Sequence, residues 1–189
     1  MIRVGWDANG YPRWIMRGNE KIEGDDYTVV SAAVDPKMLW RAPDGTVVER
    51  TERAIIADRS EMEANGRDMI VLKNLPAPCE IIINQQIVKA PTTSLAVTAT
   101  TEGPILVQLA GRYCGELLLM AKASETLAAE IRVERDRRLA VSDWTQVLDV
   151  ELSASKKLEW GAYRKALRDL PAKQPGVTLE TVKWPTPPA

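Results

Sequence analysis

Residues 160–171 read WGAYRKALRDLP, and this stretch carries the clearest structural pattern in the chain. Its bulky apolar residues are spaced by three, four and three positions: Trp160, Tyr163, Leu167 and Leu170. This spacing places all four side chains on one face of an α-helix. Ser153 offers a hydroxyl that can cap the first turn, and Pro171 lacks the amide that a further turn would use. We therefore expect an amphipathic helix over residues 153–170.

A second helix is expected just upstream, over residues 124–139. Its apolar stripe is thin, and its polar face alternates acids with arginines, which favours a self-compensated, solvated surface. Because one thin stripe does not stabilise a lone helix, we expect the two helices to fold back on each other through a turn at residues 142–144. Trp144 would lie near this corner. The Pro-rich tail from Trp184 would lie extended across the hairpin.

The rest of the chain has the shorter period of β-strands. Asn9-Gly10 and Asp44-Gly45 each separate two short β-prone runs, which predicts two hairpins. Four further strands are expected over these ranges: 80–88, 95–99, 105–109 and 116–120. Residues 51–65 fit either a short helix or a linker.

These patterns predict an α+β fold. An antiparallel β-rich N-terminal and central region, a small sandwich or Ig-like sheet, would precede a C-terminal helical hairpin with a Pro-rich extended tail. The change from period-2 to period-3.6 patterning near residues 121–124 marks a boundary. We expect three regions: 1–66, 67–121 and 122–189.

Charge and hydropathy exclude two classes of partner. Lys and Arg number 25 against 26 Asp and Glu, and no basic stripe is free of compensating acids, which argues against nucleic acid. No apolar run approaches the length of a membrane span, and residues 1–7 lack the apolar core of a signal peptide. We expect a soluble cytoplasmic chain that binds no membrane.

The inventory of reactive side chains is poor. The chain has no histidine, which removes Ser-His-Asp and Cys-His arrangements and most zinc or iron sites. Glycine-rich phosphate loops and EF-hand calcium loops are also missing. Cys79 and Cys114 are expected to be buried thiols without a disulfide. Arg112 near Cys114 leaves a reactive thiol as the alternative. We expect no enzyme, no cofactor and no metal site.

The C-terminal third combines four elements in a fixed order. A charged helix end at 135–140 precedes an S-D-W-T turn at 142–145, a W-x-x-Y-R-x-x-L-R-D-L-P helix at 160–171 and a W-P-x-P-P tail at 184–188. This order resembles the C-terminal module of bacteriophage tail assembly chaperones, also called tail fibre assembly proteins, over roughly residues 124–189. The resemblance implies a phage tail fibre or receptor-binding protein as partner, together with tail tip or baseplate proteins.

Two roles remain open within this resemblance. The chain could be a chaperone-like factor that acts in the host cytoplasm and leaves, or a permanent structural part of the virion tail that anchors the fibre. The candidate partner-binding residues are Trp144, Trp160, Tyr163, Leu167 and Trp184. An apolar helical stripe is usually core, so the leucines are expected inside the hairpin. Three tryptophans exceed what a two-helix core readily hides, and each could instead anchor a partner.

Overall fold

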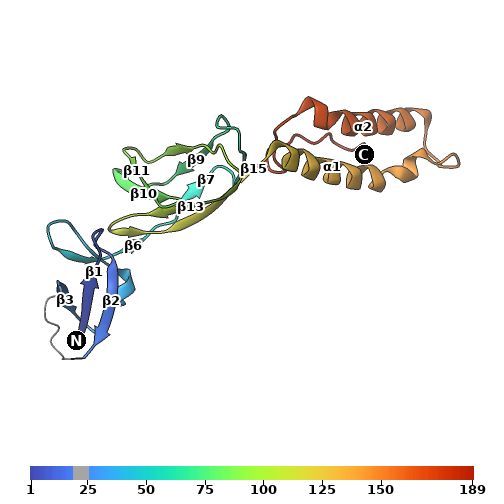
Figure 1. Cartoon of the computed structure of the whole chain (residues 1–189). Coiled ribbons are helices and arrows are strands. Elements are labelled where there is room, and N and C mark those ends of the chain that lie inside the picture. Colours follow the sequence, from blue (N-terminus) through green and yellow to red (C-terminus); the bar gives the residue numbers. More distant parts are fainter. Residues whose placement is uncertain (19–25) are drawn as a thin grey trace. The chain divides into compact units, whose positions relative to one another are not determined.

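The structure, a computed structural model, describes residues 1–18 and 26–189 (Figure 1). The chain divides into two compact units, each assembled from separate stretches of sequence. Unit 1 contains residues 1–57, 72–95 and 105–118, and unit 2 contains residues 58–71, 96–104 and 119–189. The three-region division made from the sequence stays a prediction. The α+β class is confirmed, with strands through the N-terminal and central regions and two helices at the C-terminal end.

Both predicted hairpins are present in unit 1. The first joins β1 (Ile2–Trp6) to β2 (Pro12–Arg17), and β3 (Tyr27–Val30) pairs with the other edge of β1. The second joins β4 (Leu39–Arg41) to β5 (Val47–Glu49), directly after a short 3-10 helix, η1 (Pro36–Met38). Gly10 and Gly45 have φ values of 80° and 87°, which these turns require and glycine adopts freely. Ile2, Val4 and Leu39 form the buried core beneath these strands.

The strand expected over residues 80–88 is in fact a hairpin. β10 (Cys79–Ile83) pairs antiparallel with β11 (Gln86–Ala90), and the two turn residues, Asn84 and Gln85, both have positive φ. The sequence reading missed this turn because neither residue is glycine. The Asn84 side chain supports it by accepting a hydrogen bond from the Leu106 amide at 2.9 Å.

Three more strands lie in the central region where the sequence predicted them. They are β12 (Leu95–Val97), β13 (Gly103–Leu109) and β15 (Glu116–Lys122). β10 pairs antiparallel with β13 as well as with β11. In order of hydrogen-bonded neighbours, the sheet runs β11-β10-β13-β15-β8. Its apolar positions alternate along β13, where Ile105, Val107 and Leu109 are buried.

Residues 51–65 form neither a helix nor a linker. They contain β6 (Thr51–Glu52), β7 (Ile56–Ala57) and β8 (Glu61–Glu63). β6 pairs in parallel with β14 (Tyr113–Cys114), β7 pairs antiparallel with β9 (Ile70–Lys73), and β8 pairs in parallel with β15. Each strand is only two or three residues long, so no local period could reveal it. The hydrogen bonds of these three strands come from strands that are distant in the sequence.

The predicted helical hairpin is present in unit 2. α1 (Ser124–Val141) and α2 (Ala154–Lys173) pack against each other, joined by the 3-10 turn η2 (Asp143–Gln146). The buried side chains of the two helices are Leu127, Ile131, Tyr163, Leu167 and Leu170. Within the described part of the chain, neither helix has the apolarity that crossing a membrane requires.

The two ends of α2 differ in how well the sequence predicted them. Ser153 is the N-cap, and its hydroxyl accepts a hydrogen bond from the Lys156 amide at 3.3 Å, as expected. The prediction that Pro171 ends the helix is wrong, because α2 continues to Lys173. Proline removes only one amide, and the last turn is closed by the Gln174 amide, which donates to the Leu170 carbonyl at 3.0 Å.

Candidate partner-binding site

Three aromatic rings pack edge to face in a row at the corner of the hairpin. Trp144 in η2 meets Trp160 in α2 with ring centroids 5.9 Å apart, and Trp160 meets Tyr163 at 5.6 Å. Both pairs are edge-to-face, a geometry that adds about 0.5–1.5 kcal/mol beyond burial. The row runs from the interior to the surface, since Tyr163 is 8% exposed and Trp144 is 51% exposed.

Arg164 fixes the corner that presents Trp144. Its guanidinium donates to the Leu139 carbonyl and to the Ser142 hydroxyl, both at 2.7 Å, and it pairs with Asp143 at 2.7 Å. Hydrogen bonds from a charged donor are stronger than neutral ones, and the Leu139 bond adds to those that this carbonyl accepts from the Ser142 amide and hydroxyl at the end of α1. Thr145 adds a buried bond to the Ser142 carbonyl at 2.7 Å. The exposed indole is therefore held in place.

The last residue of α1 and the connection to α2 expose further apolar side chains. Val141 and Val147 are exposed on either side of Trp144, and Leu148 is fully exposed at 100%. We call Val141, Trp144, Val147 and Leu148 the tip patch. Of these four residues, only Trp144 was predicted from the sequence to bind a partner. The available signal was the stretch 147–152, VLDVEL, in which four of six residues are apolar without the helical periodicity that would place them in a core.

The C-terminal tail lies along the hairpin, as predicted (Figure 1). The Trp184 ring lies under the Arg138 guanidinium, 4.3 Å from it, in a cation–π contact. Two hydrogen bonds at 3.0 and 2.9 Å join the Gln174 side chain to the Lys183 backbone. Further along, Lys156 donates to the Ala189 carbonyl at 2.8 Å. Trp184 is thus already engaged within the chain.

The helical hairpin, its corner and its tail together match a known family. Residues 128–189 match the family model of the phage tail assembly chaperone protein. The resemblance read from the sequence is confirmed for this region, which has a role in phage tail assembly. No curated protein and no solved structure gives a significant match. We refer below to residues 124–189 as the chaperone module.

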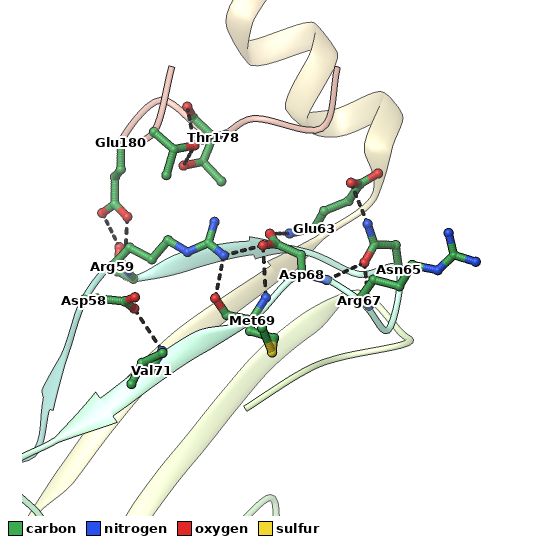
Figure 2. Close-up of polar contacts among 12 residues, drawn as sticks. Asp58, Arg59, Glu63, Asn65, Arg67, Asp68, Met69, Val71, Thr178 and Glu180 are labelled. Atoms are coloured by element: carbon green, nitrogen blue, oxygen red, sulfur yellow. Dashed lines mark hydrogen bonds and ion pairs between the residues drawn. The ribbon is translucent and has the colours of Figure 1, made fainter. Parts of the chain in front are cut away.

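Polar contacts join the base of the chaperone module to strand β8 (Figure 2). Glu180, between the end of α2 and the Pro-rich tail, accepts hydrogen bonds from the Ser60 amide at 2.9 Å and from the Ser60 hydroxyl at 2.5 Å. These bonds hold the pKa of Glu180 below its usual value. The hydroxyl of Ser124, the first residue of α1, donates to Glu63 in β8. The module is therefore tied to β8 through Ser124 and, through Glu180, to Ser60, the residue just before β8.

Lys122 lies between β8 and the first helix of the module. Its ammonium group contacts Glu61 at 2.6 Å and Glu130 at 2.7 Å. Burial alone would lower the pKa of Lys122, but hydrogen bonds to Glu130 and Glu61 outweigh it and the pKa is raised. This triad links the last residue of β15, the middle of α1 and β8.

Asp68 and its neighbours are structural. Asp68 pairs with Arg59 and accepts from the Glu63 amide at 2.8 Å, and Arg59 also donates to the Met69 carbonyl at 2.6 Å (Figure 2). Burial would raise the pKa of Asp68, but the hydrogen bonds from Arg59 and from the Glu63 amide lower it overall. The lowered pKa of Asp68 therefore reflects the hydrogen bonds that it accepts in this turn.

Unit 1 contains an open cavity of about 830 Å³ beside Cys114. Arg50, which lines it, is committed to the carbonyls of Leu109, Gly111 and Tyr113 at 2.5–3.1 Å. Both cysteines are free and half-buried, and burial raises the pKa of the Cys79 thiol, which lowers its thiolate fraction. Across residues 1–18 and 26–189, no group of three His, Cys, Asp or Glu side chains could hold a metal ion.

The five sequence-predicted site residues have different environments. Leu167 is 0% exposed and Tyr163 is buried, so both lie inside the hairpin. Trp160 and Trp184 are half-buried, and Trp144 is exposed. The structure brings Trp144, Trp160 and Tyr163 into one row, whereas Trp184 contacts Arg138 instead.

Proposed function

We propose that this chain binds a phage tail fibre or receptor-binding protein during tail assembly, through the chaperone module. The observation that carries the proposal is the half-exposed Trp144 indole, held edge-on against Trp160 by the fixed corner. Tryptophan is the residue most enriched in binding hot spots, and a pre-ordered ring loses little entropy on binding. The family match at residues 128–189 supports a tail protein as the partner.

In this role the module covers an apolar surface of the partner before that surface is buried in the finished tail. Trp144 inserts into the partner, and Trp160 supports it from behind. Tyr163 and Leu167 act indirectly, because they keep α2 packed on α1 and so keep the corner in shape. The association takes place in the host cytoplasm while the fibre folds and trimerises, and the chain then leaves.

Co-purification tests this proposal. The chain and the tail fibre protein of the same phage are produced together, with a tag on the fibre. Trp144→Ala should weaken binding by roughly 30-fold to 1000-fold, because truncating an aromatic hot spot costs about 2–4 kcal/mol. The control is Arg137→Ala, which removes an exposed pair with Glu134 and should leave binding nearly unchanged. Equal loss in both variants, or no capture by the wild type, would contradict the proposal.

A permanent place in the virion is the second candidate function. All of unit 1 lies outside residues 128–189, so most of the β structure has no counterpart in the matched family region. A sheet region of this size could dock on tail tip or baseplate proteins while the module holds the fibre. Mass spectrometry of purified virions distinguishes the two roles: stoichiometric presence supports the structural part, and absence alongside strong expression in infected cells supports the departing chaperone.

We also propose that the chain has no catalytic activity. Without histidine, acid–base chemistry near neutral pH would need a strongly shifted carboxylate, lysine or thiol in a cleft. Arg50, which lines the cavity beside Cys114, donates to three backbone carbonyls through Nε and Nη2. Slow iodoacetamide labelling of Cys114 in the native protein is expected, and rapid labelling below pH 7 would overturn this proposal.

A further inference from the structure

The segment that carries the tip patch has an unusual composition. Residues 141–152 read VSDWTQVLDVEL: six of the 12 are Val, Leu or Trp, three are acidic, and none is Lys or Arg. Elsewhere in the module bases are present among the acids, as in the arginine-rich end of α1. A stretch that combines exposed apolar side chains with charge of one sign differs from an ordinary solvated face.

Two of the three acids have no internal counter-charge. Asp143 pairs with Arg164 and belongs to the fixed corner. Asp149 and Glu151 are exposed, and neither forms an ion pair within the described residues. They flank the fully exposed Leu148 on one side, while Val147 and Trp144 lie on the other. The nearest exposed base along the chain is Lys157, on the first turns of α2.

The position of this segment makes it accessible. The contacts of Ser124, Lys122 and Glu180 hold the module to β8 at the start of α1. The segment lies at the opposite end of α1, and an 18-residue helix is about 27 Å long. A partner can therefore approach the tip without meeting β8.

We infer that the tip patch, with Asp149 and Glu151 at its rim, recognises a segment of its tail-protein partner in which apolar side chains are flanked by lysines or arginines. This inference rests on the proposed function, whose partner it describes further. The apolar side chains supply the affinity, because they leave water on contact. The unpaired carboxylates select for basic neighbours and repel acidic ones, which gives specificity more than affinity.

Two synthetic amphipathic peptides test the inference directly. They share one spacing of leucines, and their polar positions are all lysine in one and all glutamate in the other. Calorimetric titration of the full chain should show binding of the lysine peptide only, weakening as salt is raised, because exposed charges are screened. Equal binding of both peptides, or binding insensitive to salt, would overturn the inference.

Matched variants locate the contact. Leu148→Ser should weaken lysine-peptide binding by roughly 30-fold, and the fully exposed position makes a folding defect unexpected. The control, Val133→Ser, changes another exposed apolar residue, 71% exposed in the middle of α1, and should bind as the wild type. Asp149→Asn with Glu151→Gln should cost roughly tenfold, whereas Glu125→Gln at the far end of α1 should cost little.

Co-purification with the fibre protein distinguishes a failure of this inference from a failure of the proposed function. If the fibre co-purifies equally with the wild type and with Leu148→Ser, the proposed function stands and the tip inference is wrong. If the wild type does not capture the fibre but still discriminates between the peptides, the proposed function is wrong and the tip chemistry stands. If light scattering shows a dimer of the chain that Leu148→Ser abolishes, a second copy occupies the tip and the inference is also wrong.

Discussion

The Glu180 carboxylate accepts two hydrogen bonds from Ser60, one from its amide and one from its hydroxyl. Glu180→Ala should lower the free energy of unfolding by about 1 kcal/mol, because both donors return to water. The control Glu159→Ala removes an exposed i,i+3 pair with Lys156 and should cost no more than about 0.5 kcal/mol. Urea denaturation measures both changes, and equal effects would show that the Ser60 contact contributes no more than an exposed ion pair.

Glu134 predicts a specific dependence of stability on pH. Hydrogen bonds from Arg137, and then Arg138, lower the pKa of Glu134 from 4.5 to about 2. Between these values the unfolded chain binds more protons at this site than the folded chain. The stability that Glu134 contributes is therefore present above about pH 4.5 and is lost as the pH falls towards 2.

Comparison of the wild type with Glu134→Gln tests whether the stability that Glu134 contributes is lost as the pH falls. The wild type should be more stable at pH 6, and the difference should shrink as the pH is lowered through that window. Glu102→Gln, at an exposed residue without an ion pair in the described part of the chain, serves as the control. A difference that grows in acid would contradict the assignment.

At the level of residues, the sequence predicted side chains whose role follows from local spacing. The N-cap of Ser153 and the buried position of Leu167 both follow from helical periodicity. The Ser60–Glu180 contact could not be predicted, because its partners are 120 positions apart. The tip patch was missed for a different reason: its apolar residues are exposed, and pattern reading assigns apolar residues to a core.

Two of the three leucines of α2, Leu158 and Leu167, give a matched test of the helical hairpin. Leu167 is fully buried and Leu158 is 75% exposed, although both lie on the same helix. Leu167→Ala should destabilise the protein by about 2–5 kcal/mol through lost burial and a cavity. Leu158→Ala should change stability by no more than about 0.5 kcal/mol. Urea unfolding followed by helical circular dichroism measures both, and similar losses would place Leu158 in the core as well.

At the level of elements, turns were predictable where glycine marked them. Asn9-Gly10 and Asp44-Gly45 were found, whereas the turn at Asn84-Gln85 was not. Short strands were not predictable either, because β6, β7 and β8 are defined by their partners and not by their own residues. Pro171 shows the limit of a stop signal: a proline near the end of a helix does not have to be its last residue.

At the scale of the whole molecule, the sequence boundary near residues 121–124 coincides with the change from β15 to α1. The change in sequence pattern predicts a junction that proteases cleave, but the contacts in the structure lead us to expect that this junction resists proteolysis. The Lys122 carbonyl accepts from the Ala64 amide at 2.9 Å, and its side chain is held by Glu61 and Glu130. Trypsin should therefore cleave slowly after Lys122 in the native protein and rapidly in urea.

The products of that digestion decide between a separable and an integrated module. Rapid native cleavage after Lys122 that releases a stable, helical C-terminal fragment would show that the module folds alone. Slow cleavage, together with loss of helical signal in the isolated fragment, would show that the module needs β8. Mass spectrometry identifies the fragment ends, and circular dichroism reports its helix content.

The 120-residue separation between Ser60 and Glu180 also has a consequence for protein synthesis. A ribosome adds about 5–20 residues per second, so Ser60 waits roughly 6–24 s for the carboxylate that binds it. Strand β8 therefore emerges long before β15 and the tail that complete its surroundings exist. During translation, its free edge must either stay solvated or be covered by another protein, so unit 2 is among the last parts of the nascent chain to become native.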